Sequence, residues 1–199
     1  MNISEFLVAE HDEAVSRLRS QILAIVPLDR QLERLPGANS VTWITYHVAR
    51  HAALALSVVT ETAGIRDPRL NAFEPRATVG GAGLEEMQQP FADSLDPATV
   101  NAFTLSVFAD VRSFLETVTE STLDDLPDIE DALDAAGVEH DTFEWMYRMW
   151  ADQPVAFLLR WPLASHLTHH VGELTGLRNQ MGLSPFRAAP IAAGRGDTP

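Results

Sequence analysis

The chain has 199 residues, of which 46% are hydrophobic and 21% are charged, a balance typical of a single globular domain with a buried core. Acidic residues outnumber basic ones by 28 to 14, and the formal charge of −14 disfavours binding to nucleic acids and to anionic membranes. The chain has no cysteine, and all its basic residues are arginine, which excludes disulfides, iron–sulfur clusters, a cysteine nucleophile and a Schiff-base lysine. With no signal-peptide pattern and no apolar run of membrane-spanning length, we expect a soluble cytoplasmic protein.

Two amphipathic helices are predicted in the first third of the chain. Residues 4–25 carry apolar side chains at every third or fourth position, with His11 on the same face, and Pro27 is expected to end this helix. The second helix is predicted to begin after Ser40, a good N-cap residue, and to stop near Gly64.

Two further long helices are predicted in the second half of the chain. The third begins at Asp96, an N-cap residue that is followed by proline at the first helical position. The fourth is predicted over residues 162–181, with a break or kink at Pro162 and a C-terminal stop at Gly182.

Three segments between these helices have weaker patterns. Residues 64–95 and 119–141 are expected to be mostly loop, and the second of them includes a short helix near residues 129–136. Residues 142–161 have helical character, which Pro154 is expected to interrupt.

Four amphipathic helices without an alternating strand pattern predict an all-α protein, a four-helix bundle over residues 1–185. Because short loops are what join antiparallel neighbours, the two long connections argue against simple up-down-up-down order. Residues 186–199 are rich in alanine, glycine and proline and are expected to form a flexible tail.

Histidines form the main functional signal. His166 and His170 are four residues apart on the fourth helix, so they share one face and could chelate one metal ion. His47 is the natural third ligand, because it follows Trp43 by one turn on the inner face of the second helix. Three protein ligands would leave room for water or substrate, the pattern of catalytic rather than structural sites.

The other histidines have alternative roles. His51 is either a fourth ligand or a histidine of a pocket or the surface, and His169 lies about 100° around the helix from His170, which favours a packing or supporting role. His11 is expected to be a core histidine or to line a pocket, and His140 is expected to be solvated.

Two sequence motifs resemble those of the DinB-like metalloenzyme superfamily. The segment 166–173 matches the closing-helix motif H-x-x-H-H-x-G-Q/E, and the segment 36–50 resembles the second-helix motif, in which a tryptophan precedes the metal histidine by four. The resemblance covers roughly residues 5–185. It departs from the pattern at Ala52-Ala53, where an acidic residue is expected.

The resemblance implies an up-down-down-up four-helix bundle, a homodimer, and a divalent metal held by His47, His166 and His170. Members of the superfamily include thiol-dependent S-transferases and a mycothiol-dependent maleylpyruvate isomerase. Zinc or nickel is the metal that we expect first. Iron and manganese are alternatives, because sites made of histidine alone suit several of these ions.

Two reaction types would suit such a centre: attack by a small thiol, acting as a thiolate, on an electrophilic substrate, and metal-dependent hydrolysis. Since the chain has no cysteine, the thiol must be a separate small molecule. Glu173 is predicted to be a catalytic acid or base or a partner of a ligand histidine, with an arginine salt bridge as the alternative. Gly172 is expected to allow close helix packing. Residues 64–95 are expected to act as a lid over a cavity between the second and fourth helices. A metal-binding or stress-associated bundle without catalysis is the competing class.

Overall fold

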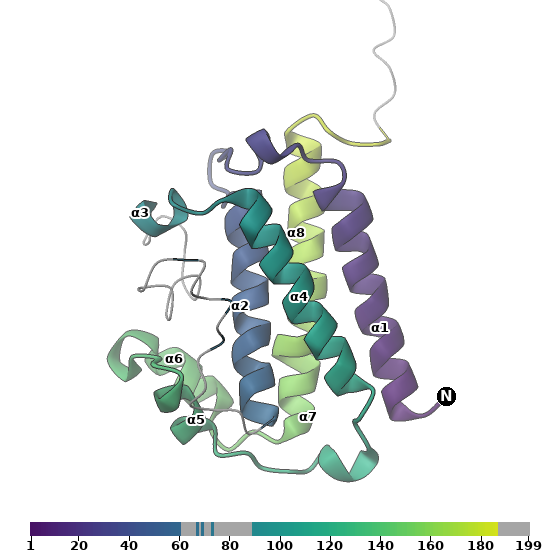
Figure 1. Ribbon diagram of the computed structural model, residues 1–199, viewed down its shortest axis with the longest axis vertical. Helices are drawn as coiled ribbons and strands as arrows, with labels where there is room; N and C mark the ends of the chain where they lie inside the picture. The colour runs from purple at the N-terminus through teal and green to yellow at the C-terminus, as the bar shows by residue number, and fades with distance from the viewer. Residues whose placement is uncertain (61–66, 68, 70–72, 74–88, 187–199) are drawn as a thin grey trace, which may run out of the picture.

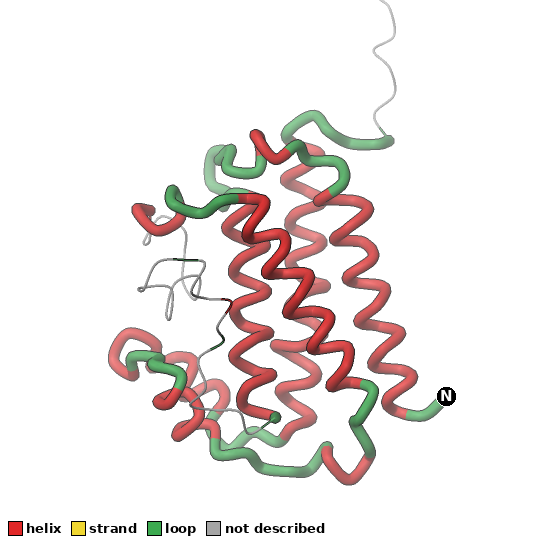
Figure 2. Tube along the Cα trace, viewed as in Figure 1, coloured by secondary structure: helices red, strands yellow, loops and turns green. Residues whose placement is uncertain are grey.

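The computed structural model describes residues 1–60, 67, 69, 73 and 89–186 of the chain. All regular secondary structure in this part is helical, and Figure 2 shows no strand among the described residues. The predicted all-α class is therefore confirmed.

Long helices dominate the molecule, and shorter ones lie in the connections between them. The long helical elements are α1 (Ile3–Arg17) with its π-helical extension η1 (Leu18–Leu23), α2 (Val41–Val59), α4 (Pro97–Leu115), and α7 (Val155–Leu158), η7 (Leu159–Ser165) and α8 (His166–Gln180) in direct succession. The shorter elements are η2 (Leu28–Arg30), α3 (Gln89–Ala92), η6 (Glu120–Thr122), α5 (Ile129–Ala135) and α6 (His140–Trp150).

Side-chain caps fix where α2 and α4 begin. The hydroxyl of Ser40 accepts a hydrogen bond from the backbone N–H of Trp43 at 3.1 Å, and this satisfies one of the free donors at the start of α2. The carboxylate of Asp96 accepts from the N–H of Thr99 at 2.8 Å, with Pro97 at the first helical position of α4. Both predicted N-caps are thus confirmed.

The prolines near the C-terminus have different effects on the helices. Pro154 is the N-cap of α7, and the helical structure is interrupted between the end of α6 and this residue, as predicted. Pro162 does not end a helix, because it lies inside the π-helical segment η7, which continues directly into α8. A π-turn is one way to place a residue that has no N–H and would collide with the carbonyl four residues earlier. Gly182, with φ of 78°, follows α8 as the predicted stop.

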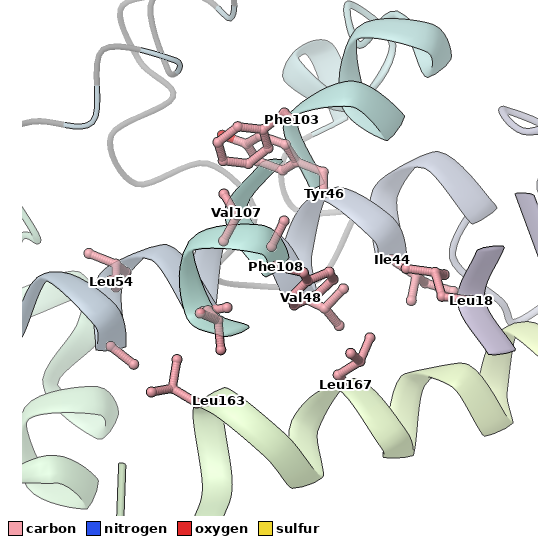
Figure 3. Close-up of a cluster of buried hydrophobic side chains, with 14 of the residues drawn as sticks. Leu18, Ile44, Tyr46, Val48, Leu54, Phe103, Val107, Phe108, Leu163 and Leu167 are labelled. Atoms are coloured by element: carbon pink, nitrogen blue, oxygen red, sulfur yellow. The ribbon is translucent and has the colours of Figure 1, made fainter. Parts of the chain in front are cut away.

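Helix α2 is the most deeply buried of the long helices. It packs against α4 and against η7 and α8, and α1 packs against α4 and α8 (Figure 1). Of its 19 residues, 14 are buried. Figure 3 shows side chains of α2, α4 and the C-terminal helices directed toward one another, among them Val48, Phe108 and Leu167. Burial of each such side chain stabilises the fold by about 1.5–3 kcal/mol.

The predicted connections are described only in part. Helix α5 (Ile129–Ala135) confirms the short helix that was predicted near residues 129–136. Gly64, most of the predicted lid over residues 64–95, and residues 187–199 of the predicted tail lie outside the described residues. No helix in the described part of the chain is both long and apolar enough to cross a membrane.

Candidate metal centre

The three predicted ligand histidines meet in the structure. His47 lies within α2, whereas His166 is the first residue of α8 and His170 follows it by one turn. The Nε2 atom of His166 lies 3.2 Å from Nε2 of His47 and 3.1 Å from Nε2 of His170. All three rings offer a ligand atom within 4.8 Å of the other two. The predicted juxtaposition is therefore confirmed.

The spacing of these nitrogens fits a metal ion. Two ligand nitrogens bound to zinc at ordinary bond lengths with tetrahedral angles lie about 3.3 Å apart. The observed separations of 3.1 and 3.2 Å are close to this value. Three imidazoles that share one small volume could hold a divalent cation, although the donor set alone does not select one metal.

His166 is prepared to act as a neutral ligand. It is 7% exposed, and burial, reinforced by the nearby rings of His47 and His170, lowers its pKa from 6.5 to about 3. Its Nδ1 atom is buried and has no hydrogen-bond partner among the described residues. Nε2 is the atom of this ring that lies close to the other two ligand rings. The low pKa keeps the ring neutral at neutral pH, so one of its nitrogens has a free lone pair.

Glu173 orients the third ligand. The Nδ1 atom of His170 donates a hydrogen bond to Oε2 of Glu173 at 2.6 Å, which places the ring proton on Nδ1 and leaves Nε2 free to bind a metal. This hydrogen bond lowers the pKa of the Glu173 carboxyl, although burial opposes the shift. The contact matches the predicted role as a partner of a ligand histidine and replaces the alternative arginine salt bridge. A role as acid or base stays a prediction.

His51 lies beside the three ligand histidines but is not one of them. It is 5% exposed, and its ring centroid lies 4.6 Å from that of His47 and 4.9 Å from that of His166. The group of mutually close ligand atoms nevertheless contains only His47, His166 and His170 among the described residues. The structure thus places His51 next to the centre without joining it.

The remaining histidines lie apart from the ligand group. His11 is buried, and its Nε2 donates to the carbonyl of Phe108 at 2.9 Å, which gives it a structural role between α1 and α4. His169 is exposed, with its ring 5.8 Å from that of Trp161. His140 is exposed at the start of α6, as predicted.

The cavity next to Glu173 differs from the predicted cavity between the second and fourth helices, because no residue of α2 and none of the three ligand histidines is in its described lining. It has a volume of about 720 Å³ and lies between the loop around Gly37 and one face of α8, where Glu173 forms part of its wall. Gly172 also lines it, and a Cβ atom at this position would meet no atom of the described residues within 4 Å. The expectation that Gly172 allows close helix packing is therefore wrong, because this face of α8 borders open space.

Two tryptophans are further neighbours of the centre, and nothing in the sequence singled out Trp145. The ring of Trp145 on α6 stacks on His51 with centroids 6.2 Å apart, and Trp161 in η7 lies 5.6 Å from His166. Both residues come from segments whose packing is not visible in the local pattern. Their aromatic character was the only available signal, and it is equally typical of core residues.

We compared the chain with protein-family models, curated proteins and solved structures, and none of them matches it. Membership of the DinB-like superfamily therefore stays a prediction from the two histidine motifs.

Proposed function

We propose that this protein is a DinB-like metalloenzyme that binds one divalent ion through His47, His166 and His170. The observation that carries the proposal is the convergence of three imidazole Nε2 atoms from two helices, with separations that suit a metal. The proposed up-down-down-up order of the bundle is supported by Figure 1, where α1 rises from the N-terminus, α2 and α4 descend, and α7 and α8 rise again.

Zinc or nickel is the proposed metal, with iron and manganese as alternatives. Imidazole nitrogen suits all of these ions to some degree, and the burial of His166 favours an ion that binds neutral nitrogen ligands strongly. A divalent ion held by neutral imidazoles is a Lewis acid that favours the ionised form of a water or thiol bound to it. The surrounding chain carries a net charge of −14, which attracts cations in general.

The proposed reaction is attack by the sulfur of a small thiol, as its thiolate, on an electrophilic carbon of a second small molecule. The thiol proton passes to solvent, a carbon–sulfur bond forms, and the leaving group of the second molecule departs with the electron pair of the bond that breaks. The chain supplies no thiol, so both reactants must be bound from solution. Glu173 holds His170 in the tautomer that presents Nε2 and at the same time borders a cavity large enough for a small substrate. In this scheme the protein orients the ligands and the substrate.

Metal-dependent hydrolysis is the second candidate. It is favoured by the partial exposure of Glu173, whose side chain is 42% accessible and could accept a proton from water. Its hydrogen bond to His170 would have to be retained or exchanged during the reaction. A bundle that holds a metal without catalysis is the outcome if neither reaction is found.

We also propose a homodimer in the cytoplasm. The first helix supports the dimer, because Phe6 on α1 is 48% exposed and borders a largely apolar groove. Light scattering at tens of micromolar protein tests it, and a monomeric mass would contradict it.

Metal content of protein purified without an affinity tag tests the proposed site. We expect about one divalent ion per chain and its loss in His166→Ala and in His170→Ala, while His169→Ala keeps full occupancy. Full occupancy in both ligand variants would overturn the assignment. With cobalt in the site, a small thiol at neutral pH should change the visible absorption spectrum, and failure of several thiols to do so would leave hydrolysis as the better candidate.

A further inference from the structure

Directly beside the metal centre, His51 has a buried nitrogen that has no hydrogen-bond partner in the described part of the chain. Its side chain lies one helical turn after His47 on α2 and is 5% exposed. Nε2 of His51 is buried and has no hydrogen-bond partner among the described residues. A buried polar atom without a partner costs stability, so it calls for an explanation, and one explanation is a molecule that binds there.

In this structure His51 does not lie where a fourth ligand would. Its ring neighbours those of His47 and His166, yet it does not belong to the group of mutually close ligand atoms. Glu173 contacts the third histidine, His170, through its Nδ1. Glu173 therefore orients His170 through a hydrogen bond, whereas His51 makes no such bond to a ligand ring of the described residues.

The ring of His51 is held in place on its other side. Trp145 of α6 stacks on it with centroids 6.2 Å apart and planes inclined by 26°. Trp145 itself is 42% exposed, so this aromatic pair extends from the buried centre to the surface. A ring fixed by a rigid helix and by stacking can present a hydrogen-bonding atom in a constant direction.

We propose that His51 binds the small molecule that joins the metal centre, by donating a hydrogen bond from Nε2 to a sulfur, oxygen or nitrogen atom of that molecule. The inference rests on the proposed metal site and adds to it a residue that recognises the exogenous molecule. Two classes of small molecule could bind in this way: a thiol, and an anion that binds through oxygen or nitrogen. Both present an anionic or electron-rich atom that accepts a hydrogen bond. His51 is thus a positioning residue for this molecule and leaves metal binding to the three other histidines.

Cobalt-substituted protein tests this role without any assay of activity. The variants are His51→Phe, which keeps a ring for stacking but has no nitrogen, and His51→Gln, which retains an N–H donor. His169→Phe is the matched control, since it removes an exposed histidine that is not a ligand. Each protein is titrated with cobalt, and the loaded protein is then titrated with 2-mercaptoethanol or with azide while the visible absorption spectrum is recorded.

We expect His51→Phe to bind cobalt within about threefold of the parent but to bind at least one of the two probes about tenfold more weakly, the effect of one lost hydrogen bond. His51→Gln should recover part of this loss, and His169→Phe should behave like the parent. A loss for 2-mercaptoethanol alone assigns a thiol, whereas a loss for azide alone assigns an oxygen or nitrogen anion.

Two results would overturn the role of His51. One is parent-like affinity for both probes in His51→Phe, and the other is a loss of cobalt affinity beyond tenfold, which would make His51 a ligand. Thermal unfolding of each metal-free variant checks its fold, and His51→Leu replaces His51→Phe if that protein is unfolded. If the parent itself does not bind cobalt, the metal site fails as well, so the two failures are distinguishable.

Discussion

Replacing Glu173 with alanine removes the hydrogen-bond acceptor of His170 without altering a ligand atom. The contact between His170 Nδ1 and Glu173 Oε2 is 2.6 Å long, which is short for such a pair and typical of a charge-assisted hydrogen bond. Loss of such a bond costs about 1.5–3 kcal/mol, equivalent to roughly 10–100-fold in affinity. Removal of a carboxylate partner from a ligand histidine generally weakens metal binding by about the same factor.

We therefore expect Glu173→Ala to lower metal affinity by about 10–100-fold. Glu173→Gln keeps an oxygen that can accept from His170 but loses the charge, so its loss should be smaller. Because the Glu173 side chain is 42% accessible, neither variant should unfold the protein. Affinity is measured by competition with a chelator of known strength, with cobalt or zinc as the metal.

The control must separate this hydrogen bond from a general change in charge. Glu13→Gln alters the net charge by the same amount at a side chain that is 63% exposed and pairs with Arg17 on α1. We expect its metal affinity to match that of the parent. The proposed orienting role of Glu173 would be refuted if Glu173→Ala also matched the parent. It would also be refuted if Glu173→Ala and Glu13→Gln lost metal affinity equally.

Three other predictions concern stability. Ser40→Ala should lower the free energy of unfolding by about 1 kcal/mol through loss of the α2 cap, seen as a fall of about 2–4 °C in Tm; an unchanged Tm would contradict the importance of this cap. Gly172→Ala should raise the free energy of unfolding by about 1 kcal/mol, because the new methyl group meets nothing within 4 Å and alanine favours the helix; destabilisation in urea unfolding would show that α8 needs the glycine. The metal-free protein should lose stability as the pH falls from 6.5 to 5. Burial lowers the pKa of His11 and, to about 3, that of His166, so the unfolded chain takes up protons that the folded one does not. Each group contributes up to about 1.4 kcal/mol per pH unit, and a flat urea-unfolding profile would argue against neutral histidines in the folded protein.

The local parts of this fold could be predicted because they depend on residues close in sequence. The N-caps at Ser40 and Asp96 follow from side chains that satisfy free N–H groups within the next turn. The pairing of His166 with His170 follows from helical periodicity, since residues four apart share a face. The contact between His170 and Glu173 has the same origin, because three residues also span about one turn.

Tertiary packing decided what the local pattern left open. Both His47 and His51 lie on α2 one turn apart, and only the approach of α8 determines that His47 contacts the Nε2 atom of His166. Trp145 reaches His51 from α6, about 90 residues later in the chain, so no short-range pattern could reveal the stack. Pro162 remains within a helix because the π-turn of η7 tolerates it, and α8 then begins at His166. Sequence periodicity determined which faces of each helix carry the chemistry, whereas the way α2 and α8 bury those faces against each other determined which histidines meet.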